Sequence, residues 1–152
     1  MVTPNIVIPQ LRHARRRAVI YLQKWIGHFY LWGGDDPSGF DCSGLILEVL
    51  KSVGLARPNI DMTADNLYRW FNENRTLKPG PGKLVFWFSR DPRSNKAIHV
   101  EMMIDNYHTV GASGGGSATK TISDAIKHNA FVKMRPLNYR GTNFKICDPF
   151  AK

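Results

Sequence analysis

The feature that most constrains this chain is a cysteine, Cys42, where a glycine-rich loop meets an expected helix. It lies in the run Gly39-Phe-Asp-Cys-Ser-Gly44, and Asp41 is a residue type that caps helix N-termini. Such an N-terminus has unpaired N–H groups and a partial positive charge, which stabilise an anionic sulfur. On an expected strand, Ile98-His99-Val100 supplies an imidazole. Together they predict a cysteine nucleophile with a histidine that pairs with the thiolate and protonates a leaving amine.

Length and composition bound the class of protein. At 152 residues the chain can bury the core of one domain, so we expect a single domain over 1–152. The contents of 43% hydrophobic and 22% charged residues are ordinary for a globular protein. No apolar run approaches the roughly 20 residues of a membrane helix. The N-terminus also lacks the pattern of a secretory signal. We expect no transmembrane segment and no signal peptide. The protein is expected to be a monomer that stays in the cytoplasm until it is released or delivered to the cell wall.

The formal net charge of +9 predicts attraction to polyanions. Arginines cluster in the first expected helix, at Arg12, Arg15, Arg16 and Arg17. The chain has no helix-turn-helix pattern, zinc spacing or RNP-like aromatic strand, so we expect no nucleic-acid partner. The charge is interpreted either as a solvated face or as attraction to an anionic cell-wall polymer.

Two cysteines are too few for a disulfide scaffold, and a bond between them would consume the nucleophile. We expect two free thiols. Cys147, which has no base-bearing motif around it, is predicted to be a small buried apolar residue. His13, His28 and His128 show no metal-ligand spacing, so neither a metal nor another cofactor is predicted.

Apolar periodicity predicts helices first and an antiparallel sheet second, an α+β fold in which N-terminal helices pack on a small sheet. The expected helices cover about 8–27, 42–53 and 64–73, with a helical turn around 123–128. The expected strands cover 84–88, 98–104, 107–112 and 130–136. Residues 30–41 are predicted to form a loop, Asp105-Asn106 a tight turn, and 139–152 a tail of uncertain order.

The order of the motifs resembles the NlpC/P60 family over roughly residues 22–135. The motifs are Tyr30-x-Trp-Gly-Gly, Phe40-Asp-Cys-Ser-Gly-Leu45, Pro81-Gly-x-Leu-Val-Phe86 and the His99-Val100 strand. The resemblance implies a papain-like fold and a cysteine peptidase that cuts peptidoglycan stem peptides. The bond implied joins a D-γ-glutamyl residue to a diamino acid.

The resemblance also implies roles for individual residues. Cys42 matches the nucleophile and His99 the base, while Tyr30 matches a tyrosine that helps hold the substrate or the oxyanion. Asp41 and Ser43 match residues that help form the substrate pocket. From the residues themselves, the backbone N–H of Cys42 and the Tyr30 hydroxyl can both donate to a tetrahedral oxyanion.

The third catalytic member departs from the family pattern. The family commonly places a polar residue about twelve positions after the base, where this chain has Gly111. Glu101 is the favoured substitute because strand alternation puts it on the face of His99, about 6–7 Å away. A backbone carbonyl or a water is the second alternative. His108 is the third, opposite Met103 on that face if Asp105-Asn106 is a two-residue turn.

Lys83 is a second departure, because the family often has Asp at this position before the strand. Two alternatives to a peptidase stay open: an amidase, acyltransferase or thioesterase on the same scaffold, and a non-catalytic cell-wall-binding module. A basic chain without a leader fits a bacteriophage lysin (an endolysin), a virion component or a delivered effector.

Overall fold

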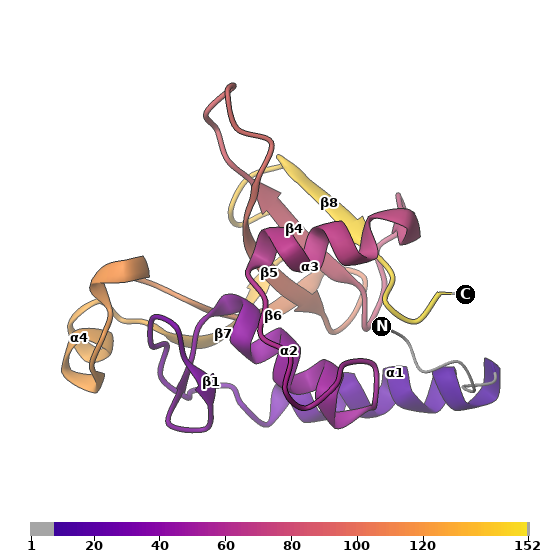
Figure 1. The fold of residues 1–152 in the computed structure, drawn as a ribbon, viewed down its shortest axis with the longest axis horizontal. Coiled ribbons are helices and arrows are strands. Elements are labelled where there is room, and N and C mark those ends of the chain that lie inside the picture. The colour runs from indigo at the N-terminus through magenta and orange to yellow at the C-terminus, as the bar shows by residue number, and fades with distance from the viewer. Residues whose placement is uncertain (1–7, 152) are drawn as a thin grey trace.

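The computed structural model describes residues 8–151 and has helices packed on one face of a six-stranded antiparallel sheet (Figure 1). The helices are α1 (Ile8–Gln23), α2 (Cys42–Ser52), α3 (Ala64–Phe71) and α4 (Ile122–Lys127), with 3-10 turns at Asn72–Asn74 and Gly116–Ala118. The sheet has the order β3 (Arg75–Thr76), β8 (Phe144–Cys147), β4 (Leu84–Phe88), β5 (Ala97–Met103), β6 (His108–Ser113), β7 (Phe131–Pro136). The expected α+β class is confirmed.

Helix α1 follows the predicted apolar periodicity. Leu11, Ala14, Ala18 and Leu22 are buried on one side, and this side packs on α2. The helix ends at Gln23, four residues before the expected boundary, and turns follow it. Within residues 8–151, no helix is long and apolar enough to cross a membrane.

The two faces of the sheet are buried by different parts of the chain. In β5, Val100 and Met102 face the main core beneath the helices. Alternation turns His99, Glu101 and Met103 to the other face. There Met103 packs in a second apolar cluster with Val85, Trp87 and Ile146, against Leu137, Tyr139 and Phe144. The catalytic candidates of β5 therefore lie under the C-terminal segment of the chain.

The loop before α2 is held against the first turn of that helix. It contains a short hairpin, β1 (Asp35–Asp36) with β2 (Gly39–Phe40), that the sequence did not predict. Asp41 caps α2 as predicted, because its side chain accepts a hydrogen bond of 2.7 Å from the Gly44 N–H. A Cβ on Gly44 would lie 2.0 Å from the carbonyl oxygen of Gly34. Glycine at position 44 therefore lets the loop pack on the helix.

The C-terminal tail is ordered into the sheet, contrary to the expectation for 139–152. Strand β8 lies between β3 and β4, and Lys145 stands opposite Phe86 in the ladder. Further along, Asp148 forms an ion pair of 2.9 Å with Arg15 of α1. The strand has only four residues, Phe144–Cys147, which is too short for alternation to mark it in the sequence.

The connection between β5 and β6 corrects the predicted tight turn. Met103 pairs with Thr109, and the Ile104 N–H donates to His108, so the turn is longer than two residues. This shift of one position moves His108 to the opposite face from His99. The third alternative for the catalytic member, His108, is therefore wrong; its ring contacts Asp105 instead, at 3.0 Å.

Substitution Gly44→Ala tests the packing of the loop on α2. Because the added methyl meets backbone, we expect the free energy of unfolding to fall by about 1–3 kcal/mol. Lys51→Ala, in the last turn of the same helix, is the control and should change it by about 0.5 kcal/mol or less. Urea denaturation measures both. Equal stability of Gly44→Ala and the unaltered protein would contradict the close approach.

Candidate active site

A groove of about 580 Å³ lies where the first turn of α2 meets the beginning of β5. Its walls include Cys42, His99 and Tyr30, so residues from three distant parts of the sequence meet in one hollow. A β-bulge between Trp87 and Phe88 shifts the register of β4 against β5 just before His99. Bulges of this kind re-aim side chains next to functional sites.

Cys42 is the first residue of α2 and is half-buried in the groove. Its backbone N–H, at the helix N-terminus, has no acceptor within the helix. Helix α3 supports the opposite side of the groove, because the side chain of Asp65 accepts a hydrogen bond of 3.0 Å from the Ala97 N–H. That contact fixes the chain two residues before His99.

His99 lies between Cys42 and Glu101. Its Nε2 donates to Glu101 Oε1 at 2.8 Å, and this leaves Nδ1 for the sulfur. Burial by itself lowers the pKa of His99, but its contacts with Cys42 and Glu101 outweigh burial and raise that pKa above its ordinary value. The arrangement favours an imidazolium, the form that pairs with a thiolate.

Glu101 is fully buried, and its carboxylate accepts hydrogen bonds from three side chains, one of which is His99. Thr109 Oγ1 donates to its Oε2 at 2.5 Å, and the Tyr139 hydroxyl donates to its Oε1 at 2.5 Å. Burial by itself raises the pKa of Glu101, but the hydrogen bonds from His99, Thr109 and Tyr139 hold it below its ordinary value. The side chain is therefore a carboxylate oriented toward His99.

Gly111 makes room for this carboxylate. Continuing the register of β5 and β6 puts Gly111 opposite Glu101, and a Cβ there would lie 2.3 Å from Glu101 Cγ. The sequence resemblance led us to expect a third polar side chain at position 111. The side chain of Glu101 occupies that space instead, and only a glycine at position 111 leaves room for it. Glu101 and Gly111 therefore belong to one arrangement.

Tyr30 is held on both sides by backbone hydrogen bonds. Its N–H donates to the Ala130 carbonyl at 3.1 Å, and a bridge links it to Phe40 of β2. Burial raises the pKa of its hydroxyl, and the neighbouring Cys42 and Asp41 raise it further. The hydroxyl therefore stays protonated and can donate toward the groove.

Asp41 and Ser43 also line the groove, and their side chains contact each other. Asp41 accepts from the Gly44 N–H, from the Gly33 N–H at 3.2 Å and from the Ser43 hydroxyl at 3.3 Å. Burial raises the pKa of Asp41, partly offset by these hydrogen bonds. In this structure both residues build the loop–helix junction, and their contacts with a substrate stay predictions.

The remaining chemistry-bearing residues lie elsewhere. Lys83 donates to the Lys78 carbonyl at 2.8 Å and does not line the groove. Cys147 is fully buried, which raises the pKa of its thiol to about 11. Within residues 8–151, no three His, Cys, Asp or Glu side chains gather as metal ligands would.

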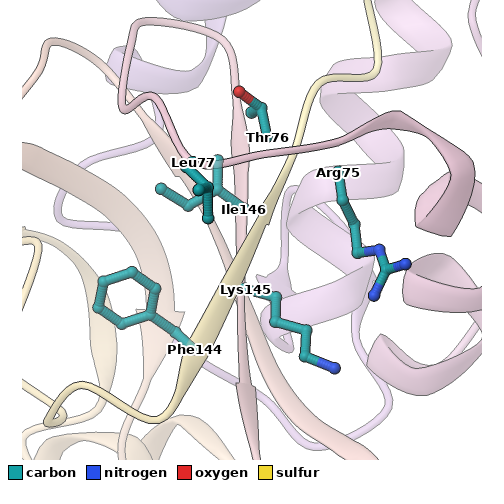
Figure 2. Close-up of a pocket in the computed structure, with 6 residues that line it drawn as sticks. All are labelled: Arg75, Thr76, Leu77, Phe144, Lys145 and Ile146. Carbon is teal, nitrogen blue, oxygen red and sulfur yellow. The ribbon is translucent and has the colours of Figure 1, made fainter.

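A second hollow lies at the outer edge of the sheet, between β3 and β8 (Figure 2). Figure 2 shows Phe144, Ile146 and Leu77 on one side of β8 and Lys145 and Arg75 on the other. Its lining contains no cysteine, histidine or acidic residue, so it lacks the groups for acyl transfer.

The sequence profile of the NlpC/P60 family matches residues 27–136. The chain belongs to the NlpC/P60 family. Among curated relatives, murein DD-endopeptidase MepH of Escherichia coli is 30% identical over 130 residues, which cover 68% of this chain and 46% of MepH. The probable endopeptidase p60 of Listeria welshimeri is 33% identical over 94 residues, 62% of this chain and 17% of p60. The chain thus spans less than half the length of either relative.

Solved structures share the fold. The peptidoglycan hydrolase RipB of Mycobacterium tuberculosis superposes with a TM-score of 0.65 at 24% identity, covering 97% of this chain and 70% of RipB. NlpC1 of Trichomonas vaginalis gives a TM-score of 0.70 at 19% identity, covering 92% of this chain and 45% of NlpC1. The fold expected from the resemblance is confirmed.

Part of the NlpC/P60 site in this chain lies outside the matched region. Tyr139, which bonds Glu101, and Arg140, which lines the groove, follow residue 136. The sequence did not predict that either residue belongs to the site, because a tail without periodicity does not show which part of the fold it packs against. Thr109 could have been found by alternation, had the register with β5 been placed correctly.

Alkylation tests the different environments of the two cysteines. In the native protein near neutral pH, iodoacetamide should label Cys42 in its groove but not Cys147, whose thiol is buried and fully protonated. Peptide mass spectrometry should find one adduct in native protein and two in denaturant. Native Cys42→Ala protein, as the control, should take up none. Comparable labelling of Cys147 would contradict its burial.

Proposed function

We propose that this domain is a cysteine endopeptidase that hydrolyses peptidoglycan stem peptides. The observation that carries the proposal is the ring of His99, held between the nucleophile candidate Cys42 and a buried carboxylate. Support comes from the NlpC/P60 match and from relatives named as an endopeptidase and a peptidoglycan hydrolase. The substrate bond proposed is the one between a D-γ-glutamyl residue and a diamino acid.

In the first half-reaction, the sulfur of Cys42 attacks the carbonyl carbon of the scissile amide. The negative charge passes to the carbonyl oxygen, which accepts hydrogen bonds from the Cys42 N–H and the Tyr30 hydroxyl in this proposal. The C–N bond then breaks, and the His99 imidazolium gives its proton to the leaving amine. The product is a thioester on Cys42 with a neutral imidazole beside it.

In the second half-reaction, His99 takes a proton from water as the water oxygen attacks the thioester carbonyl. The C–S bond breaks, which releases a carboxylic acid and restores the thiolate beside an imidazolium. Glu101 keeps the ring in place through both steps. Its negative charge also stabilises the imidazolium, in the way a triad carboxylate does.

The net charge of +9 gives the domain a further means of finding its substrate, because anionic wall polymers attract a basic protein. The arginines Arg12, Arg16 and Arg17 are exposed on α1 and are free to take part. Delivery by a bacteriophage, expected from the sequence, stays a prediction.

Digestion of purified peptidoglycan tests the proposal. The unaltered protein should release peptides, and Cys42→Ala should slow release by about three orders of magnitude or more, because the covalent route is lost. Cys147→Ala is the matched control and should retain the activity. Mass spectrometry of the products distinguishes the γ-glutamyl bond from a D,D bond, the type in the name of MepH. Equal release by the unaltered protein and Cys42→Ala would refute the proposal.

The pH dependence tests the role of Glu101. Glu101 favours the protonated form of His99, so Glu101→Gln should lower the pKa of His99 and move the alkaline limb of kcat/KM to lower pH. We also expect kcat/KM at its maximum to fall at least about 10-fold. The control Asp105→Asn removes a surface carboxylate that contacts His108 and should leave the profile unchanged. An unshifted alkaline limb in Glu101→Gln would assign Glu101 a purely structural role.

A further inference from the structure

Arg140 lies in the catalytic groove although it follows the NlpC/P60-matched region. Among the groove-lining residues that the structure describes, it is the one lysine or arginine. The groove that contains Cys42 and His99 therefore also contains one cationic side chain, from a segment that follows the family-matched residues 27–136.

The turn that carries Arg140 is anchored on both sides of it. The Tyr139 hydroxyl donates to Glu101, and the Trp87 Nε1–H donates to the Gly141 carbonyl at 3.4 Å. The Gly141 N–H closes the turn on the Asn138 carbonyl at 3.0 Å, and Gly141 has a φ of +86°, which favours glycine. These contacts fix the backbone of Arg140 relative to the catalytic carboxylate.

The guanidinium is not neutralised by an acid. None of the ion pairs formed within residues 8–151 involves Arg140. The acidic residue that lines the groove, Asp41, is already bound to two backbone N–H groups and a hydroxyl. The Arg140 side chain does hydrogen-bond to the neutral hydroxyl of Tyr139. Its positive charge partly offsets the rise in pKa that burial causes at Tyr30 and Tyr139.

The proposed substrate carries a matching group. A glutamyl residue linked through its γ-carboxyl keeps its α-carboxylate free, within a few bonds of the scissile carbonyl. Arginine binds a carboxylate with two parallel hydrogen bonds, and this gives both affinity and orientation.

We propose that Arg140 binds the free α-carboxylate of the γ-linked glutamyl residue and thereby selects acidic over amidated stem peptides. This inference rests on the proposed function for its substrate. It adds a specificity residue supplied by the C-terminal segment, with Tyr139 as the positioning residue that holds the turn on Glu101.

Calorimetry on the Cys42→Ala protein tests binding without turnover. Two stem peptides are compared that differ in one group, the α-carboxylate or the α-carboxamide of the γ-glutamyl residue. Cys42→Ala should bind the carboxylate peptide about 10- to 100-fold more tightly, the range for a hydrogen-bonded charge. Adding Arg140→Gln should abolish this preference by weakening binding of the carboxylate peptide alone. Arg140→Lys should restore part of it, because a lysine keeps the charge without the two-pronged geometry.

Arg90→Gln is the matched control, since Arg90 lines an adjoining hollow but not the groove, and it should keep the preference. A preference that survives Arg140→Gln, or failure of Cys42→Ala to bind either peptide, would overturn the inference. The proposed function is judged separately by turnover. If Arg140 governs binding but the unaltered protein cleaves neither peptide, the peptidase proposal fails and the carboxylate site stands.

Discussion

The buried contact between His99 and Glu101 is the interaction on which the site depends. Neither group is stable alone in such a place, because burial opposes the charge of each. Together, and with Thr109 and Tyr139 bonded to the carboxylate, they form a satisfied polar cluster on the face of the sheet opposite the helices. A buried network that is fully bonded is also rigid, so the ring has one orientation in which to meet Cys42.

The same cluster explains an apparent defect in the sequence. Gly111 stands where the family resemblance led us to expect a polar side chain, and taken alone it suggests a damaged site. In the structure the carboxylate comes from β5 instead of β6, and the missing side chain is what admits it. A motif comparison scores sequence position alone, so it cannot show that a carboxylate from β5 contacts His99.

Local sequence signals predicted much of the secondary structure. They did not predict which segments far apart in the sequence pack together. Asp41 acts as the predicted cap because capping depends on a neighbour three residues away, here Gly44. The pairing of Glu101 with His99 followed from alternation along one strand. Tyr139 and strand β8 could not be predicted, because their positions depend on a chain return after residue 136 that leaves no periodic pattern. The register error at His108 arose similarly, from a turn longer than its sequence indicated.

Strand β8 has a consequence for how the domain matures. It pairs on both sides, between β3 and β4, and the segment before it supplies Tyr139 to Glu101. Ribosomes make Cys42 and His99 well before these residues. A nascent chain therefore carries Cys42 and His99 while the sheet still lacks an interior strand and Glu101 lacks its hydrogen bond from Tyr139. Synthesis order alone delays completion of the candidate site until Tyr139 and β8 have been translated.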